Sequence, residues 1–378
     1  MREKIKQIIE SYRESAPLAE AYTIPSSWYV DPRVAQLENE ALFARNWQMA
    51  GRTDQVAEPE QFFTGEVAGE RVVVVRDANR ELRAFYNVCR HHAAAVVTES
   101  EGHAANFRCP YHGWTYGTDG TLKGTPDFDG VCNFDRSKNG LVPVRVAAWE
   151  KFVFVNLDAK SGSLEAFLGG LIKRVEPLRL ASLHFFERRC YDLNCNWKVY
   201  VDNFLDGGYH VPYLHKGLNS VLDYANYTIE NEDRFCLQSS PVETSSANAD
   251  ADAAATRQGK RAFYFWQYPN FMLNWYEGYL DTNLVLPLSI DRCRVIFDFY
   301  FADTGHGAKE YNQQSVAVSH RVQEEDVGIC EAVQRGLHSR AYVAGRLSVR
   351  REAGEHLFHR LLRADLKAGL DCGHDSNE

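Results

Sequence analysis

The sequence predicts an α+β protein with one small all-β domain and one larger domain that mixes helices and strands. Hydrophobic residues make up 45% of the 378 residues and charged residues 25%, which is ordinary for a globular enzyme that buries a sizeable core. Residues 48–158 consist of short β-type runs separated by Gly, Asp and Asn, whereas the rest of the chain mixes helical stretches with longer β-type runs. This change of pattern predicts two domains of different architecture.

The first part of the chain is expected to pass from helices into the all-β domain. Residues 1–20 and 31–46 mix apolar and charged positions as surface helices do, and Asp31-Pro32 stands near the start of the second stretch. Within the all-β segment we expect strands at 71–75, 82–86, 107–110 and 152–156.

After residue 158, predicted helices and strands follow one another, with one polar interruption. Residues 239–260 are rich in Ala, Asp, Ser and Thr, so we expect a mobile surface loop there. We expect helices at 163–180, 197–218, 308–338 and 353–368, and extended segments at 184–195, 262–275, 281–288 and 292–302.

Charge and cysteine content exclude several classes of protein. The net charge of −9 argues against broad binding to nucleic acid or anionic membranes, because both need clustered positive charge. No run of about 18 apolar residues occurs, and the first residues lack the apolar stretch of a secretory signal. The nine cysteines are odd in number and scattered, so they do not form a disulfide framework. We expect a cytoplasmic protein with no nucleic-acid or membrane partner.

Two cysteines and two histidines in the all-β segment form the first candidate metal site. Cys89-x-His91 is followed, after seventeen intervening residues, by Cys109-x-x-His112. A Rieske [2Fe–2S] cluster needs two thiolates on one iron and two imidazoles on the other, and each short motif supplies one of each. A zinc site is the alternative, although zinc motifs usually pair Cys with Cys and His with His within one loop. The pattern therefore favours the cluster.

These motifs, followed by Gly113-Trp114, resemble the Rieske domain of ring-hydroxylating and related Rieske non-heme iron oxygenases. The resemblance implies a Rieske β domain inserted in a helix-wrapped antiparallel-sheet (helix-grip-like) catalytic domain. The N-terminal helices that pack on the catalytic domain, the Rieske domain and the catalytic domain itself are expected over residues 1–45, 46–158 and 159–378. The family usually has Arg after the first His, where this chain has His92. That departure puts the usual hydrogen bonding around the cluster in doubt.

A second candidate metal site contains His210 and His215, five positions apart in a predicted helical segment. Two imidazoles and one carboxylate form the facial triad of non-heme Fe(II) oxygenases. The Tyr-His-x-x-x-x-His string resembles the mononuclear-iron motif of the same family. The family's carboxylate ligand is an Asp followed five positions later by a Glu, and that resemblance selects Asp326. Its neighbours Glu325 and Glu331 are expected on a solvated helix face.

The family also uses an acidic residue to couple the cluster of one subunit to the iron of the next. That residue usually lies three positions before the first iron-binding His, where this chain has Gly207. The resemblance therefore implies Asp206 as the coupling residue, because adjacent glycines let the chain bulge and redirect it. Asp202 is the alternative. Asn203 matches a family residue that approaches the iron.

Several segments resemble the branch of the family that contains choline monooxygenase and the bacterial carnitine and betaine oxygenases. They are residues 25–29, 209–216, 268–272, 330–337 and 356–359. A quaternary ammonium accepts no hydrogen bonds, so its site should consist of aromatic faces with a carboxylate nearby. Residues 263–279 form the densest aromatic run, which could equally be a central strand packed on both faces. Because alternate strand residues share a side, Phe271, Trp275 and Tyr279 are the expected pocket residues.

The resemblance implies an oxygenase that hydroxylates a small cationic substrate, choline to betaine aldehyde hydrate, with O₂ and two electrons. A [2Fe–2S] cluster and a mononuclear Fe(II) are its implied cofactors. The chain lacks a nucleotide-binding glycine fingerprint and a plant-type ferredoxin spacing, so a separate ferredoxin or flavin reductase must supply electrons. A head-to-tail homotrimer is implied. The alternatives are an aromatic-ring oxygenase, an N- or O-demethylase, and an electron carrier without catalytic iron.

Overall fold

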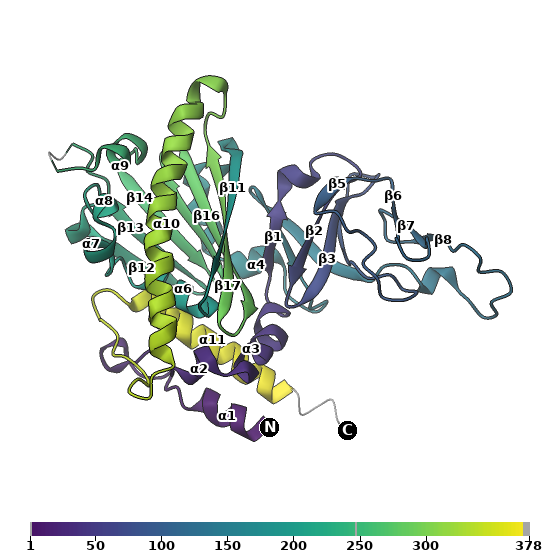
Figure 1. Cartoon of the computed structure of the whole chain (residues 1–378), viewed down its shortest axis with the longest axis horizontal. Coiled ribbons are helices and arrows are strands. Elements are labelled where there is room, and N and C mark those ends of the chain that lie inside the picture. The colour runs from purple at the N-terminus through teal and green to yellow at the C-terminus, as the bar shows by residue number, and fades with distance from the viewer. Residues whose placement is uncertain (1, 246–247, 373–378) are drawn as a thin grey trace. The chain divides into compact units, whose positions relative to one another are not determined.

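The computed structural model describes residues 2–245 and 248–372, which form two compact units (Figure 1). The β unit covers Asn39–Phe167, and the helix–sheet unit joins Met1–Glu38 to Leu168–Glu378. One unit is thus inserted into the other, which confirms the predicted α+β architecture. The three-part division of the chain stays a prediction, and the unit boundaries lie outside the predicted 46–158. None of the described helices is long and apolar enough to cross a membrane.

The β unit consists of two antiparallel sheets. The larger has the order β1-β10-β9-β4-β3-β2-β5, and the smaller has the order β6-β7-β8. The strands are β1 (Gln48–Arg52), β2 (Gln61–Val67), β3 (Glu70–Arg76), β4 (Leu82–Tyr86), β5 (Glu101–His103), β6 (Asn106–Arg108), β7 (Thr115–Gly117), β8 (Leu122–Gly124), β9 (Pro143–Trp149) and β10 (Phe152–Asn156). The predicted strands at 71–75, 82–86 and 152–156 are confirmed, and the one at 107–110 ends at Arg108.

Strand β3 shows why this segment forms a sheet that is buried on both faces. Alternate residues of a strand point to opposite sides. Val73 and Val75 pack in the hydrophobic cluster that contains Cys89 and Cys109. The alternate residues of β3, Val72 and Val74, pack in a second cluster on the other side. The sheet therefore supports the cysteine loops from one side.

The helix–sheet unit contains one seven-stranded antiparallel sheet with the order β11-β17-β16-β15-β14-β13-β12. Its strands are β11 (His184–Leu193), β12 (Thr228–Glu232), β13 (Phe235–Pro241), β14 (Arg261–Gln267), β15 (Phe271–Tyr276), β16 (Tyr279–Ser289) and β17 (Arg292–Phe301). The first strand in sequence, β11, pairs with the last, β17. The helices that lie between β11 and β17 in the sequence are therefore outside the sheet.

The helices of this unit include one long helix, α10, which contacts α6, α9 and β11 (Figure 1). The α-helices among the described residues are α1 (Arg2–Glu10), α2 (Ser27–Val30), α3 (Pro32–Glu38), α4 (Leu164–Leu168), α5 (Leu171–Val175), α6 (Trp197–Leu205), α7 (Val211–Leu214), α8 (Lys216–Asn219), α9 (Ala251–Thr256), α10 (Lys309–Leu337) and α11 (Ala353–Cys372). One face of α10 is buried yet polar. It carries Ser315, Ser319, Gln323 and Asp326 at helical spacing.

Several predicted elements differ from those observed. The helix expected over 1–20 ends at Glu10, and 163–180 forms short helical turns instead of one helix. The strand expected over 262–275 is two strands, and β12 was not anticipated. The surface loop expected over 239–260 contains the end of β13 and helix α9, because Asp250 caps α9 by accepting from the Ala253 N–H. Residues 246–247 of that segment lie outside the described residues, and its mobility stays a prediction.

The helix expected over 197–218 is interrupted where the candidate metal ligands His210 and His215 lie. Helix α6 begins at the Asn196 cap and ends at Leu205, and α7 begins at Val211. Between them Gly207 and Gly208 have φ values of +69° and +70°, a region that other residues rarely adopt. A side chain at Gly207 would also collide with the Arg351 carbonyl oxygen. The two glycines therefore allow a sharp turn that a continuous helix would not.

Candidate active site

Two short loops of the β unit carry the paired cysteines and histidines. The Cys89 N–H donates to the Ala94 carbonyl oxygen and the Cys109 N–H donates to the Trp114 carbonyl oxygen, both at 2.8 Å. Each loop thus closes on itself five residues after its cysteine. Both thiols are buried, with exposures of 3% and 2%. The two loops present their thiols to the interior in the same way, as a shared ligand would require.

The histidines of the loops lie next to each other. The His91 and His112 ring centroids are 4.7 Å apart, and His91 stacks on Trp114 with an interplanar angle of 4°. The Nδ1 atom of His91 is buried and has no hydrogen-bond partner among the described residues. A cluster iron would satisfy that nitrogen, so two thiols and two imidazoles fit a Rieske [2Fe–2S] cluster.

Two further side chains adjoin these loops. The Tyr116 hydroxyl lies 3.3 Å from Cys89 Sγ and accepts from the Arg90 N–H at 3.0 Å, a contact that the sequence did not indicate. His92 is exposed, and its ring centroid lies 4.1 Å from that of His91 and 5.2 Å from that of His112. The choice of His91 over His92 as ligand stays a prediction that rests on the motif spacing.

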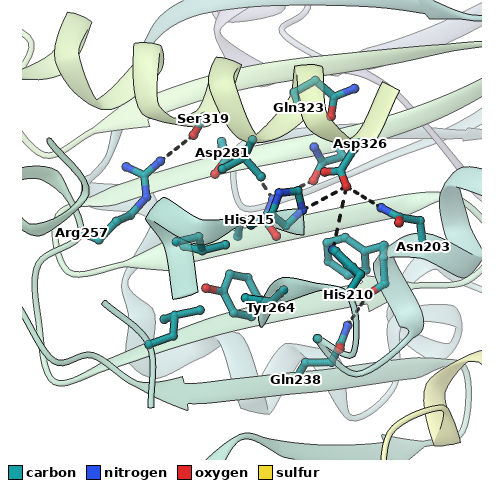
Figure 2. A pocket seen from close by; sticks show the side chains of 18 of the residues that line it. Asn203, His210, His215, Gln238, Arg257, Tyr264, Asp281, Ser319, Gln323 and Asp326 are labelled. Atoms are coloured by element: carbon teal, nitrogen blue, oxygen red, sulfur yellow. Dashed lines mark hydrogen bonds and ion pairs between the residues drawn. The ribbon is translucent and has the colours of Figure 1, made fainter. Parts of the chain in front are cut away.

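His210, His215 and Asp326 come together in the helix–sheet unit. One ligand-type atom of each lies within 4.8 Å of the others. The Nε2 atoms of His215 and His210 lie 3.1 Å and 3.9 Å from Asp326 Oδ1. Figure 2 shows both rings directed at that carboxylate. Two imidazole nitrogens and a carboxylate around one point form the donor set of a mononuclear Fe(II) site.

Carboxylates hold the far nitrogens of both imidazoles. His210 Nδ1 lies 2.6 Å from Asp206 Oδ2, and His215 Nδ1 lies 2.6 Å from Glu325 Oε2. Such outer carboxylates fix the tautomer and orientation of metal-binding histidines. Burial lowers the pKa of His215, but Asp326 and Glu325 outweigh burial and raise that pKa above its ordinary value in the metal-free chain. The Nε2 atoms are thereby left facing the metal position.

The structure corrects the expectation for two glutamates of α10. Glu325 does not lie on a purely solvated face, because it is bonded to the buried His215. Glu331 Oε1 accepts from both the backbone N–H and the side-chain amide of Asn194. Both were missed because charged residues on a helix are usually solvated.

The acids proposed as coupling residues have different surroundings. Asp206 accepts from His210 and from the Tyr209 N–H, so it is bonded to the candidate iron site. Asp202 instead accepts from the Tyr29 hydroxyl at 2.5 Å and contacts His359 Nε2 at 3.0 Å. Asn203 donates to Asp326 Oδ1 at 2.8 Å. Of the two acids, only Asp206 contacts an imidazole of the triad.

A cavity of about 130 Å³ adjoins the triad (Figure 2). Its wall includes several tyrosines, three amide side chains on strands and the buried polar face of α10. The lining includes Tyr200, Tyr227, Gln238, Arg257, Tyr264, Asn274, Tyr276, Asp281, Ser319 and Gln323, together with the three triad residues. Two of its buried polar atoms, Asn274 Oδ1 and Gln323 Nε2, have no hydrogen-bond partner in the described part of the chain. Such atoms are costly to bury unless a ligand or water pairs with them.

Apart from the triad, the described residues of the cavity wall include one buried acid, Asp281, and one buried cation, Arg257. Burial raises the pKa of Asp281 to about 6, although the charge of Arg257 opposes the shift. Arg257 donates to Ser315 Oγ at 2.8 Å and Ser319 Oγ at 2.7 Å. Burial also raises the pKa of Tyr227 and Tyr264 well above its ordinary value, so both remain neutral phenols.

Phe271, Trp275 and Tyr279 do not line this cavity, which corrects the expectation for the aromatic run. The neighbours Asn274 and Tyr276 line it instead, so the opposite face of β15 looks into the cavity. Trp275 packs on Phe263 with ring centroids 5.8 Å apart. Tyr279 pairs with Tyr276 across the turn between β15 and β16, so it points to the cavity face of the sheet, where its hydroxyl bonds to Ser319 at 2.7 Å. Alternation holds within β15, but the turn places Tyr279 on the opposite face from Phe271 and Trp275. A run that is aromatic on both faces also does not indicate which face is open.

Comparisons with known proteins agree with this geometry. Residues 46–135 match the Rieske [2Fe–2S] domain, and residues 180–368 match the ring-hydroxylating alpha subunit catalytic domain. The chain is 40% identical to the chloroplastic choline monooxygenase of Arabidopsis thaliana over 374 residues, which cover 96% of this chain and 87% of that protein. It is 33% identical to the carnitine monooxygenase oxygenase subunit of Escherichia coli K12, covering 85% and 86%.

A solved structure is also similar over nearly the whole chain. It is a quaternary ammonium Rieske monooxygenase described as giving insight into carnitine oxidation and inter-subunit electron transfer. The TM-score is 0.83 at 27% identity, with 93% of this chain and 98% of that chain covered. The family model, the relatives and the donor sets of both sites lead to one conclusion. The chain belongs to the Rieske non-heme iron monooxygenases, enzymes that use a [2Fe–2S] cluster and a mononuclear iron.

Proposed function

We propose that the chain hydroxylates a small quaternary ammonium compound, with choline as substrate and betaine aldehyde hydrate as product. The observation that carries this proposal is the tyrosine wall of the cavity beside His210, His215 and Asp326. Aromatic faces attract a cation that cannot donate N–H hydrogen bonds. Choline also has a hydroxyl group, which can pair with the unpartnered Asn274 Oδ1 or Gln323 Nε2.

In this proposal His210, His215 and Asp326 hold the iron, which activates O₂ when bound. Asp206 and Glu325 keep the two rings turned so that their Nε2 atoms face the metal. The aromatic and apolar side chains of the wall surround part of a bound substrate and limit its contact with water. The chain's own residues thus supply orientation and partial shielding, and the metal supplies the chemistry.

Cys89, Cys109, His91 and His112 are proposed to hold the [2Fe–2S] cluster, which receives electrons from a separate ferredoxin or flavin reductase. We further propose a head-to-tail homotrimer in which the cluster of one subunit serves the iron of the next. The inter-subunit electron transfer named for the similar solved structure supports this arrangement. A cytoplasmic location stays a prediction, because the plant relatives are named as chloroplastic.

Asp206 is the proposed coupling residue, because it contacts His210 Nδ1 at 2.6 Å. Asp206→Asn should slow cluster-to-iron electron transfer while both metals remain bound. Single-turnover oxidation of the reduced cluster, followed by its visible absorption, measures that step. Asp202→Asn is the matched control, since Asp202 bonds to Tyr29 and His359 instead. Equal rates in wild type and Asp206→Asn would remove Asp206 from this role.

A zwitterionic substrate, such as carnitine, is the second candidate, and Arg257 favours it. The Arg257 guanidinium lines the cavity, is 3% exposed, and has no acidic side chain within 4.0 Å among the described residues. A substrate carboxylate could supply the missing partner. If so, Arg257→Gln should impair turnover of carnitine more strongly than turnover of choline.

The test is O₂ consumption and product mass for the iron-loaded enzyme with a surrogate reductase. Choline, L-carnitine, gamma-butyrobetaine and a neutral aromatic acid are offered separately. Coupled oxidation of choline supports the first candidate. Oxidation of L-carnitine and gamma-butyrobetaine, without oxidation of choline, supports the second. Oxidation of the aromatic acid alone refutes both and favours a ring oxygenase. An iron content of about two per chain, instead of about three, would indicate an electron carrier.

A further inference from the structure

Asp281 is a buried acid at the centre of the cavity wall whose role is not explained by metal binding. It lies on β16, lines the cavity and is 4% exposed. No basic side chain lies within 4.0 Å of its carboxylate in the ranges 2–245 and 248–372. A buried carboxylate without an ion-pair partner is costly, so its retention beside a ligand cavity calls for a compensating charge.

The sheet register places Asp281 in a row of polar side chains. Gln238 pairs with Tyr264, Tyr264 with Asn274, and Asn274 with Asp281 across four neighbouring strands. Directly paired residues point to the same face of a sheet, and all four line the cavity. Asn274 Nδ2 donates to Asp281 Oδ2 at 3.3 Å and to Asn283 Oδ1 at 2.7 Å. The row therefore fixes the carboxylate against the cavity.

Two tyrosine rings meet at an angle beside this carboxylate. The Tyr264 and Tyr276 hydroxyls are 2.6 Å apart, their ring centroids are 6.0 Å apart, and their planes meet at 78°. Tyr227 stacks on Tyr264 at 6.4 Å and 14°, which supports it from behind. The faces of aromatic rings carry partial negative charge. Carboxylate and rings together make one negative corner of the cavity wall.

Arg257 adjoins that corner without forming an ion pair with Asp281. Its Cζ atom lies 5.1 Å from the Tyr276 ring centroid and 4.8 Å from that of Tyr279. Its side-chain hydrogen bonds include those to Ser315 and Ser319 on α10 and to the adjacent Thr256. Arg257 thus lowers the electrostatic cost of the Asp281 charge across the cavity wall, and no hydrogen bond between the two groups has to break when a ligand enters.

We infer that Asp281 determines specificity for a cation, by holding the substrate's ammonium group between its carboxylate and the rings of Tyr264 and Tyr276. This inference rests on the proposed function and adds to it the residue that recognises charge. A quaternary ammonium needs no hydrogen-bond acceptor at close range, so a carboxylate and two ring faces suffice. The alcohol end of the substrate is then left for the part of the cavity near the triad.

The test compares two ligands that differ only in charge: choline and 3,3-dimethyl-1-butanol, in which carbon replaces the nitrogen. Dissociation constants are measured by calorimetry on the enzyme with both metals bound and without reductase. Wild type should prefer choline by about tenfold or more. Asp281→Asn should weaken choline binding by about tenfold and change the neutral ligand by less than about twofold. Asp281→Glu keeps the charge and should retain the preference.

Tyr264→Leu, with Tyr264→Phe as its matched control, tests the other half of the corner. The leucine variant should lose most of the preference for choline, and the phenylalanine variant should keep it, because only the ring face is needed. This pair decides the matter if Asp281→Asn does not assemble, as judged by cluster absorption and iron content.

The inference and the proposed function fail in different ways. Wild type that binds choline with a preference that Asp281→Asn leaves intact refutes the inference alone. Equal losses for both ligands in Asp281→Asn also refute it, since they indicate a general disturbance of the cavity. Wild type that binds neither choline nor carnitine refutes the proposed function itself.

Discussion

The two candidate metal sites differ in how far apart their residues lie in the sequence. In the β unit, all four proposed cluster ligands lie between Cys89 and His112, on two loops that close in the same way. In the helix–sheet unit, His215 directly follows α7 and Asp326 lies on α10. They lie 111 positions apart in the sequence, and only the fold of the unit brings them together. A site whose residues are close in sequence depends on the geometry of its loops, whereas a site whose residues are far apart depends on the whole fold. The comparison indicates which mutations should affect only one of the two sites.

The largest expected effect is a loss of turnover, caused by a mutation that disrupts only one of the two sites. His210→Ala should abolish turnover and reduce iron from about three to about two per chain, while the red absorption of the cluster remains. Cys89→Ser is the matched change in the other unit and should lose that absorption. Iron analysis and visible spectra of both variants check this. Loss of the cluster spectrum in His210→Ala would mean that the two sites are not separate.

The next effect concerns stability and compares a buried ion pair of the helix–sheet unit with an ion pair of the β unit whose arginine is exposed. Lys198 Nζ lies 2.7 Å from Glu38 Oε1, with both side chains almost fully buried. Lys198→Met leaves that carboxylate uncompensated and should lower the free energy of unfolding by about 3–5 kcal/mol. In the β unit, Arg83→Met should cost only about 1 kcal/mol, because its partner Asp77 keeps hydrogen bonds from two backbone N–H groups. Denaturant titration of both variants tests the difference.

A smaller effect is expected from the carboxylate that orients His215. Glu325→Gln should weaken iron binding about 10–100-fold and leave the cluster intact, because the ring of His215 loses its anchor. Glu324→Gln removes a charge from the neighbouring, exposed position and is the control. Competition with a chelator gives the iron affinities. Identical affinities in the two variants would reduce Glu325 to a surface charge.

The smallest effect is a dependence on pH that should arise in the helix–sheet unit alone. Burial raises the pKa of Asp281 to about 6, and only the ionised carboxylate attracts a cation. Substrate affinity should therefore rise with pH and be about twofold lower at pH 6 than at high pH. Arg257, Tyr264, Tyr276 and Tyr279 also face this region, but they do not change charge there. KM for choline against pH, in wild type and Asp281→Asn, measures it; the variant should show a flat profile.

The same contrast explains what could be predicted from sequence. The cysteine and histidine loops and the His210–His215 pair were indicated by spacing, because their partners are close in the chain. Tyr264, Asp281 and Arg257 gave no such signal. Their positions depend on the register of β14 to β16 and on a helix, α9, inside a segment that resembled a surface loop. Strand alternation identified two faces of the aromatic run but could not indicate which one lines the cavity.

Helix α10 holds His215 from both ends of its ring. Glu325 contacts Nδ1 and the next residue, Asp326, contacts the Nε2 side. If the helix shifts when a substrate enters or a product leaves, the ring is drawn along with the carboxylate beside it. The spacing between these two proposed ligands then changes less than the shape of the cavity does. Small movements of the cavity walls should therefore leave the site intact, because two of the three proposed iron ligands, His215 and Asp326, move together.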